Sequence, residues 1–186
     1  MHLPLNLLRF KKRMKDSNIQ NTKIKESFSK LKINDPKIMI NDYAIELIPN
    51  YWNYSFVTNF IPLLVIPFIF KMKNANLEIN LLCTLATLLS IYLIIDQLIS
   101  NNKLIINLQN KTITVIPNLI TKLWKKEKII EFKDAKNIYN SPDTFSPLYR
   151  RFIIKILLKD SLKMRLISTQ LPENANKICT ILLGSF

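Results

Sequence analysis

The chain has 186 residues, of which 27 are Lys or Arg and 13 are Asp or Glu, so its net charge at pH 7 is +14. Its mean hydropathy is nevertheless +0.11, so charged and apolar residues must occupy different regions. The single glycine, Gly184, excludes a glycine-rich phosphate-binding loop, and the single histidine, His2, argues against histidine catalysis and histidine metal ligands. We therefore expect no enzymatic activity, no cofactor and no metal site.

The N-terminal part of the chain is strongly basic. Residues 1–37 contain ten basic and three acidic residues. Their low aromatic content favours disorder, whereas apolar residues at helical spacing among the lysines would suit a helix lying on anionic lipid. We predict a flexible or interfacial arm. Residues 38–53 are predicted to be a juxtamembrane segment, in which 38–48 suits either a helix or a strand.

Two apolar runs occupy the nearly uncharged middle of the chain, at about 54–71 and 79–99. A membrane-spanning helix needs about 20 mostly apolar residues, and each run reaches that length once flanking Tyr, Trp and Asn residues are included. The linker between them is short, which predicts a two-helix transmembrane hairpin over 54–100. Basic flanks on both sides place both termini in the cytoplasm, so the protein is expected to be a multi-pass protein of the cell (inner) membrane.

Two polar residues fall inside these runs. Asn59 lies about four residues into the first predicted helix, and Asp96 lies about three residues from the end of the second. They are therefore at matching depth and are a candidate intramembrane polar pair. Ionisable groups in a membrane are often functional, but Asp96 is close enough to the headgroups to be hydrated or to play a structural role.

From Lys103 onward the hydrophobic period changes to two, which is typical of half-buried strands. A two-residue turn at 110–111 would place Leu108 opposite Ile113 and keep the apolar faces together. The second hairpin requires a longer loop. A three-residue loop at 159–161 places Ile156 opposite Met164 and predicts a bulge nearby.

Two further strands are expected between the hairpins, at 119–124 and 128–133. The chain then ends in an amphipathic helix over 172–185, with Pro172 at its first position. Residues 103–186 are thus predicted to form an antiparallel sheet of about six strands, closed by a C-terminal helix.

This order of elements resembles the bacterial PH-like membrane proteins, in which a two-helix membrane hairpin is followed by a paired-strand unit and a terminal helix. The residues that carry the resemblance are 104–115, 128–139 with its Phe132-Lys133-Asp134-Ala135 step, 151–168 and 172–186. The resemblance implies an α+β membrane protein with a two-helix transmembrane hairpin and a cytoplasmic antiparallel β-sheet, either a PH-like sandwich or a partly open barrel, capped by the C-terminal helix. It implies no enzymatic activity.

A basic cluster surrounds one tryptophan of the predicted sheet domain. Its members are Lys122, Trp124, Lys125, Lys126 and Lys128. Lysines at an anionic membrane surface each contribute about 1 kcal/mol, so the cluster is a candidate contact to lipid headgroups; a solvated loop tip is the alternative. No aromatic–basic interleaving or recognition helix is visible, so no nucleic-acid partner is expected.

These observations predict a non-enzymatic, membrane-anchored protein that presents a PH-like interaction domain at the cytoplasmic face. Its expected partners are the lipid bilayer, anionic headgroups or an unknown protein, and a homo-oligomer is possible. The alternative is a small membrane component, such as a toxin-immunity, transport or channel accessory protein, that acts through its transmembrane hairpin. Asn59 and Asp96 are the residues that support this alternative.

Overall fold

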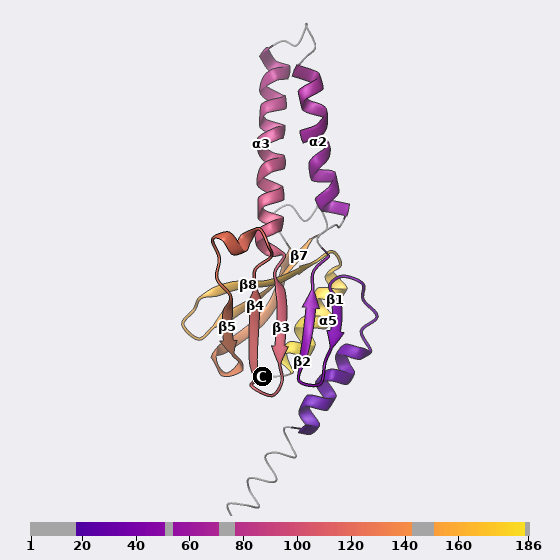
Figure 1. Ribbon diagram of the computed structural model, residues 1–186, viewed down its shortest axis with the longest axis vertical. Coiled ribbons are helices and arrows are strands. Elements are labelled where there is room, and N and C mark those ends of the chain that lie inside the picture. Colours follow the sequence, from indigo (N-terminus) through magenta and orange to yellow (C-terminus); the bar gives the residue numbers. More distant parts are fainter. Residues whose placement is uncertain (1–17, 51–53, 71–76, 143–150, 185–186) are drawn as a thin grey trace, which may run out of the picture.

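The computed structural model describes residues 18–50, 54–70, 77–142 and 151–184. It consists of a β-rich body from which two helices project side by side (Figure 1). The strands are β1 (Lys37–Ile40), β2 (Ala44–Ile48), β3 (Lys103–Asn107), β4 (Thr112–Ile116), β5 (Lys128–Glu131), β6 (Ala135–Pro142), β7 (Phe152–Leu158) and β8 (Lys163–Thr169). The helices are an N-terminal helix at residues 18–29, α2 (Tyr54–Phe70), α3 (Leu77–Ser100), the 3-10 helices η1 (Thr121–Leu123) and η2 (Phe132–Asp134), and α5 (Pro172–Leu183).

The first five strands form one antiparallel sheet in the order β1-β2-β3-β4-β5. Every second residue of β2, β3 and β4 is buried, as the period of two predicts for β3 and β4. The central pairing is between β2 and β3, where Ile45 lies opposite Ile106 and Leu47 lies opposite Leu104. These four side chains are completely buried, so this pairing forms the centre of the sheet's inner face.

The segment at 38–48, left open between helix and strand, therefore belongs to the body rather than to a juxtamembrane segment. In β2 the buried Ile45 and Leu47 alternate with half-buried neighbours, which suits a strand buried on one face. The chain leaves the sheet at Ile48, runs through α2 and α3, and returns to the neighbouring strand at Lys103. The residues that precede the helices and those that follow them thus build one folded unit.

The second sheet has three strands in the order β6-β7-β8. The predicted loop at 159–161 is confirmed, because the Leu158 N–H donates to the Leu162 carbonyl and Ile156 lies opposite Met164. A bulge is present too, but it lies between Ile154 and Lys155 and not at the loop, so that Ile154 lies opposite Ile167. The single predicted sheet is nevertheless wrong, since the strands divide between two sheets.

The turn between β3 and β4 differs from the predicted one. Asn107 lies opposite Thr112, so four residues connect the strands instead of two. The Asn107 side chain accepts hydrogen bonds from the N–H groups of Gln109 and Asn110, which ends the strand early. Lys111 takes the positive φ of 53° that the turn needs. The register shifts by two residues, which keeps each side chain on its predicted face.

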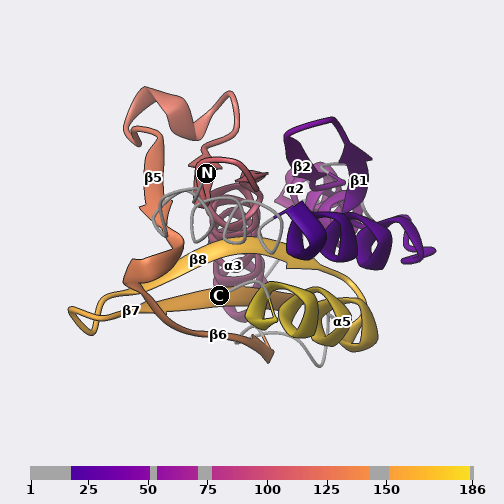
Figure 2. The same ribbon diagram turned by 90° about the horizontal axis from the view of Figure 1, so that it is seen from below.

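The core lies between the two sheets and is completed by two helices that are far apart in the sequence. Ile24 and Phe28 of the N-terminal helix pack into it, as do Ala175, Ile178 and Leu182 of α5. Figure 2 shows the N-terminal helix beside β1, and α5 beside β6 and β7. The predicted flexible or interfacial arm is therefore wrong for residues 18–29, while residues 1–17 lie outside the described part.

The predicted two-helix transmembrane hairpin is wrong. Among the described residues, one helical stretch, Leu77–Asp96 in α3, is long and apolar enough to cross a membrane. The other helix, α2, has 17 residues and is about 26 Å long, short of a 30 Å hydrocarbon core. The charge-free part of the sequence extends back to Leu47, but Leu47 and Ile48 belong to β2 and cannot lengthen this helix. The predicted fold class is therefore wrong, and multi-pass topology is not supported.

Asp35 links the N-terminal segment to the C-terminal part of the body. Its carboxylate accepts hydrogen bonds from the N–H groups of Gln170, at 3.0 Å, and Asn50, at 3.3 Å. Its backbone carbonyl accepts from the Thr169 hydroxyl and the Asn174 side-chain amide. One residue thus joins the segment before β1 to the link between β8 and α5.

The Asp35 carboxyl is expected to make stability depend on pH. Burial raises its pKa above the ordinary value of 3.8, although the Gln170 and Asn50 N–H groups act in the opposite direction. The folded state therefore holds this proton more tightly than the unfolded state, and the contribution is lost as pH rises through the folded-state pKa. Relative to Asp35→Asn, the wild type should lose stability as the pH rises above the ordinary carboxyl pKa of 3.8, as measured by urea unfolding. A difference between the two proteins that stays constant with pH would contradict this assignment.

Candidate functional site

The last turns of α3 are attached to the body by an ion-pair cluster. Asp96 accepts hydrogen bonds from Arg151, which directly precedes β7, and from Arg165 of β8, at 2.7 Å. The side chains of Asp96 and Arg151 are only 15% and 6% exposed. A carboxylate that binds two guanidinium groups with little access to water forms a strong contact of defined geometry. It fixes the direction in which α3 leaves the body.

Asp96 was predicted to pair with Asn59 in the membrane, but the structure gives it other partners. The Asn59 side chain lies outside the described part of the structure, although its backbone is within α2. Asp96 is occupied by Arg151 and Arg165, which sequence reasoning missed because they lie 55 and 69 residues away. One signal was available. The chain uses Lys far more often than Arg, and arginine is the cation best suited to a buried ion pair with a carboxylate.

Two more polar contacts hold the base of α3, and an ion pair joins the strand that follows it to its neighbour. The Asn118 side-chain amide donates to the Leu98 carbonyl, one of the four carbonyls that a helix end leaves without an internal partner. The Ser168 hydroxyl donates to the Asn101 side chain. Lys103 forms an ion pair with Glu46 at 2.7 Å, between β3 and β2. The base of α3 is therefore rigidly joined to both sheets.

The segment at 119–124 was predicted to be a strand, but residues 121–123 form the 3-10 helix η1. Asn118 is the cause, because its side-chain oxygen accepts from the N–H groups of Ile120 and Thr121, at 3.0 and 2.9 Å. Such local bonds offer the backbone an alternative to a sheet ladder. The same Asn118 amide holds Leu98, so η1 is fixed beside the base of α3.

A basic groove, with a volume of about 450 Å³, lies between the segment after η1 and the β8 hairpin. Its lining residues are Asn102, Val115, Pro117, Trp124, Lys125, Lys126, Lys128, Lys163, Met164 and Arg165. Four of the five residues predicted as a lipid contact line it, and Lys122 does not. Sequence reasoning missed Lys163 and Arg165, which the β7–β8 hairpin brings in from the other side.

The cations of the basic groove are close enough to affect one another. Burial lowers the pKa of Lys125, and the charges of Arg165 and Lys128 lower it further, while the Asp96 carboxylate acts in the opposite direction. None of the lining residues is acidic. An anion bound in the groove would therefore relieve repulsion between groups that are already partly desolvated.

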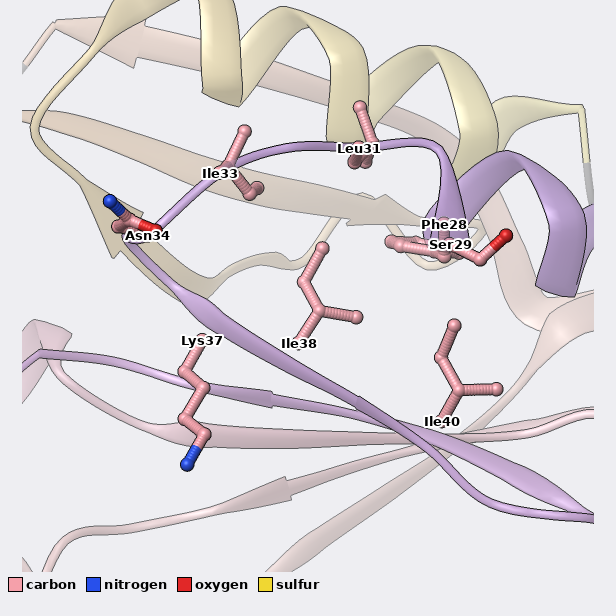
Figure 3. Close-up of a pocket in the computed structure, with 8 residues that line it drawn as sticks. All are labelled: Phe28, Ser29, Leu31, Ile33, Asn34, Lys37, Ile38 and Ile40. Carbon is pink, nitrogen blue, oxygen red and sulfur yellow. The ribbon is translucent and has the colours of Figure 1, made fainter.

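A second cavity, of about 590 Å³, lies beside the edge strand β1. Figure 3 shows Ile38 and Ile40 of β1 pointing toward the segment that carries Leu31 and Ile33, with Lys37 pointing away. Its remaining lining residues are Phe28, Ser29 and Asn34. Five of its eight lining residues are apolar and its one charged side chain, Lys37, points away, so it offers less charge for ligand recognition than the basic groove.

The two cysteines are Cys83 in α3 and Cys179 in α5. Both are buried and in the reduced thiol form. Burial raises the pKa of Cys179 to about 12. Its thiol therefore stays protonated at neutral pH and fills space in the core, since the thiolate is the reactive form.

No protein-family model matches this chain, and no curated protein is significantly similar to it. The resemblance to bacterial PH-like membrane proteins consequently stays a prediction that no match supports.

Proposed function

We propose that this is a non-enzymatic membrane-anchored protein, in which α3 enters the lipid bilayer and holds the basic body at the cytoplasmic membrane surface. There the body binds anionic lipid or a protein partner. The observation that carries the proposal is the length and apolar character of Leu77–Asp96 together with the exposure of its leucines. Basic residues favour the cytoplasmic side, and the body carries most of the chain's positive charge.

The distribution of residues around α3 supports a lipid environment. The exposed positions include Leu81, Leu82, Leu85, Leu88 and Leu89. The buried positions among its described side chains are Cys83 and Ser90, which are small, and Leu93 nearer the base of the helix. A surface helix of a soluble protein has the opposite arrangement, with its large apolar residues turned inward. Small residues at the packed face and leucines outside are typical of helices in membranes.

The threonine hydroxyls of α3 are consistent with this environment. The Thr87 hydroxyl donates to the Cys83 carbonyl and the Thr84 hydroxyl to the Asn80 carbonyl, so both hydroxyls are satisfied within α3. A helix in lipid must satisfy its polar groups internally, because no water is available to do so. The two threonine hydroxyls thus add little cost to the transfer of α3 into a bilayer.

Charge introduced on the exposed face of α3 is expected to release the protein from membranes. Lysine is disfavoured at the centre of a spanning helix by about 3 kcal/mol, so Leu85→Lys with Leu88→Lys should cost about 6 kcal/mol or more. We expect the wild type to stay in the membrane pellet after alkaline carbonate washing and the double variant to move to the supernatant. A wild-type protein that carbonate washes off would overturn the proposal.

A matched control separates anchoring from a general effect of lysine. Leu162 lies in the body, in the loop between β7 and β8, and is 60% exposed, as Leu88 is at 59%. Leu162→Lys should therefore leave the membrane fraction unchanged. Resistance of the body to limited proteolysis, measured in the same samples, reports whether each variant is folded.

A further inference from the structure

A short segment next to the base of α3 exposes four large apolar side chains to solvent. Leu119 and Leu123 are 87% and 83% exposed, and Ile120 and Trp124 beside them are about half exposed. We call these four residues the apolar lip. Figure 1 shows η1, which carries the lip, at the end of the body from which α3 projects. Exposed apolar patches of this kind mark surfaces that are covered by a membrane or a partner.

The position of the apolar lip is fixed. Asn118 accepts hydrogen bonds from Ile120 and Thr121 and donates to the Leu98 carbonyl of α3. Thr121 is completely buried under the lip, which anchors η1 to the body. The lip is therefore held at a constant level relative to the point where α3 leaves the body. An α3 in the bilayer would bring these side chains to the headgroup layer.

The basic groove opens beside the apolar lip, and Trp124 belongs to both. Lys125, Lys126 and Lys128 approach it from one side and Lys163 from the other. Tryptophan is favoured at membrane–water interfaces, where its ring and its N–H face different environments. Apolar side chains flanked by lysines are the arrangement of interfacial segments that bind anionic membranes.

We propose that the apolar lip inserts into the headgroup layer and that the basic groove binds the phosphate of an anionic phospholipid. This inference rests on the proposed membrane anchoring and assigns the ligand of the body. The occupant is a lipid rather than an acidic protein or a nucleic acid, because a purely polyanionic partner would leave Leu119 and Leu123 in water. Arg165 belongs to the groove and also binds Asp96, so the lipid site adjoins the contact that fixes α3.

The test uses the full chain in neutral detergent with Trp52→Phe, so that Trp124 is the remaining tryptophan. Short-chain phosphatidylglycerol is titrated while Trp124 fluorescence is recorded, and short-chain phosphatidylcholine is the uncharged comparison. We expect a blue shift that saturates with phosphatidylglycerol alone. Lys126→Gln with Lys128→Gln, both exposed positions, should weaken the apparent affinity about 30-fold, at about fivefold for each lysine.

Two further variants complete the experiment. Lys136→Gln with Lys177→Gln removes the same charge from exposed positions outside the groove and should change the affinity less than threefold. Leu119→Ser with Leu123→Ser keeps the charge and should weaken binding of the lipid but not of glycerol phosphate. If the two double lysine variants weaken binding of phosphatidylglycerol to the same extent, the lipid is attracted by the overall charge and not by the groove. That result would overturn the proposed site.

The outcomes also distinguish the ligand sources and the two proposals. An equal response to glycerol phosphate and to phosphatidylglycerol would assign the groove to a free phosphate compound and overturn a lipid surface. An equal response to a polyglutamate peptide would assign it to an acidic protein. Absence of any response from a protein that resists carbonate washing would overturn this inference and leave the membrane anchor intact. Loss of the membrane fraction itself would overturn the anchor.

Discussion

Replacing Asp96 by Asn is expected to lower the free energy of unfolding by roughly 3 kcal/mol. The carboxylate contacts two guanidinium groups, and the Arg151 side chain beside it is 6% exposed. Removing one partner of a buried ion pair is costly because the remaining charge keeps its desolvation penalty and loses its compensation. Urea unfolding of the detergent-solubilised chain, followed by circular dichroism, measures the effect.

Two comparisons show whether this loss comes from the buried pair. Glu131 and Lys133 form an exposed ion pair at 2.7 Å, so Glu131→Gln should leave the unfolding midpoint unchanged. Asp96→Leu combined with Arg151→Met should recover most of the stability lost in Asp96→Asn, since an apolar pair of similar volume needs no desolvation. A double variant as unstable as Asp96→Asn would show that the charges themselves are required.

The parts of the fold that sequence reasoning found are those in which neighbouring residues decide the structure. The β7–β8 hairpin followed from alternation and from one loop length that kept Ile156 opposite Met164. The C-terminal helix followed from Pro172 at its start and from a stripe of apolar residues. Each of these depends on contacts between residues fewer than about 15 positions apart.

The parts that it missed depend on pairing between distant segments. β2 pairs with β3 across the whole of α2 and α3, so the partner of Ile45 is Ile106. Periodicity shows that a segment has one apolar face but not which strand lies beside it. The same limit applied to residues 38–48. Without its partner strand, the sequence of β2 is equally consistent with a juxtamembrane helix.

For the same reason, sequence analysis predicted only one side of the basic groove. Trp124 and the lysines that follow it are consecutive in the chain, so they could be recognised as a cluster. Lys163 and Arg165 join them only because the β7–β8 hairpin folds back over the end of the five-stranded sheet. The exposed leucines of the apolar lip were instead assigned to a strand. This segment forms η1 because the Asn118 side chain accepts local backbone hydrogen bonds. A pattern of apolar and polar residues does not reveal such bonds.

Replacing Phe28 by Ala is expected to cost about 3–5 kcal/mol of stability. Phe28 is 1% exposed and lies in the core with Ile24, although both come from a segment whose composition suggested an arm outside the body. Truncating a buried phenylalanine removes apolar contacts and leaves a cavity that the surrounding strands fill only in part. Urea unfolding and amide hydrogen exchange in β1 and β2 measure the loss.

The matched control is Ile19→Ala on the same helix, where the side chain is 47% exposed and the change should cost less than about 1 kcal/mol. If the N-terminal helix belongs to the cooperative unit, Phe28→Ala will lower protection in β3 and β4 as well as in β1. Faster exchange confined to residues 18–29 would instead mean that this helix unfolds independently. The two sheets would then form a complete core without it, and Asp35 would be the contact that holds the N-terminal segment to the body.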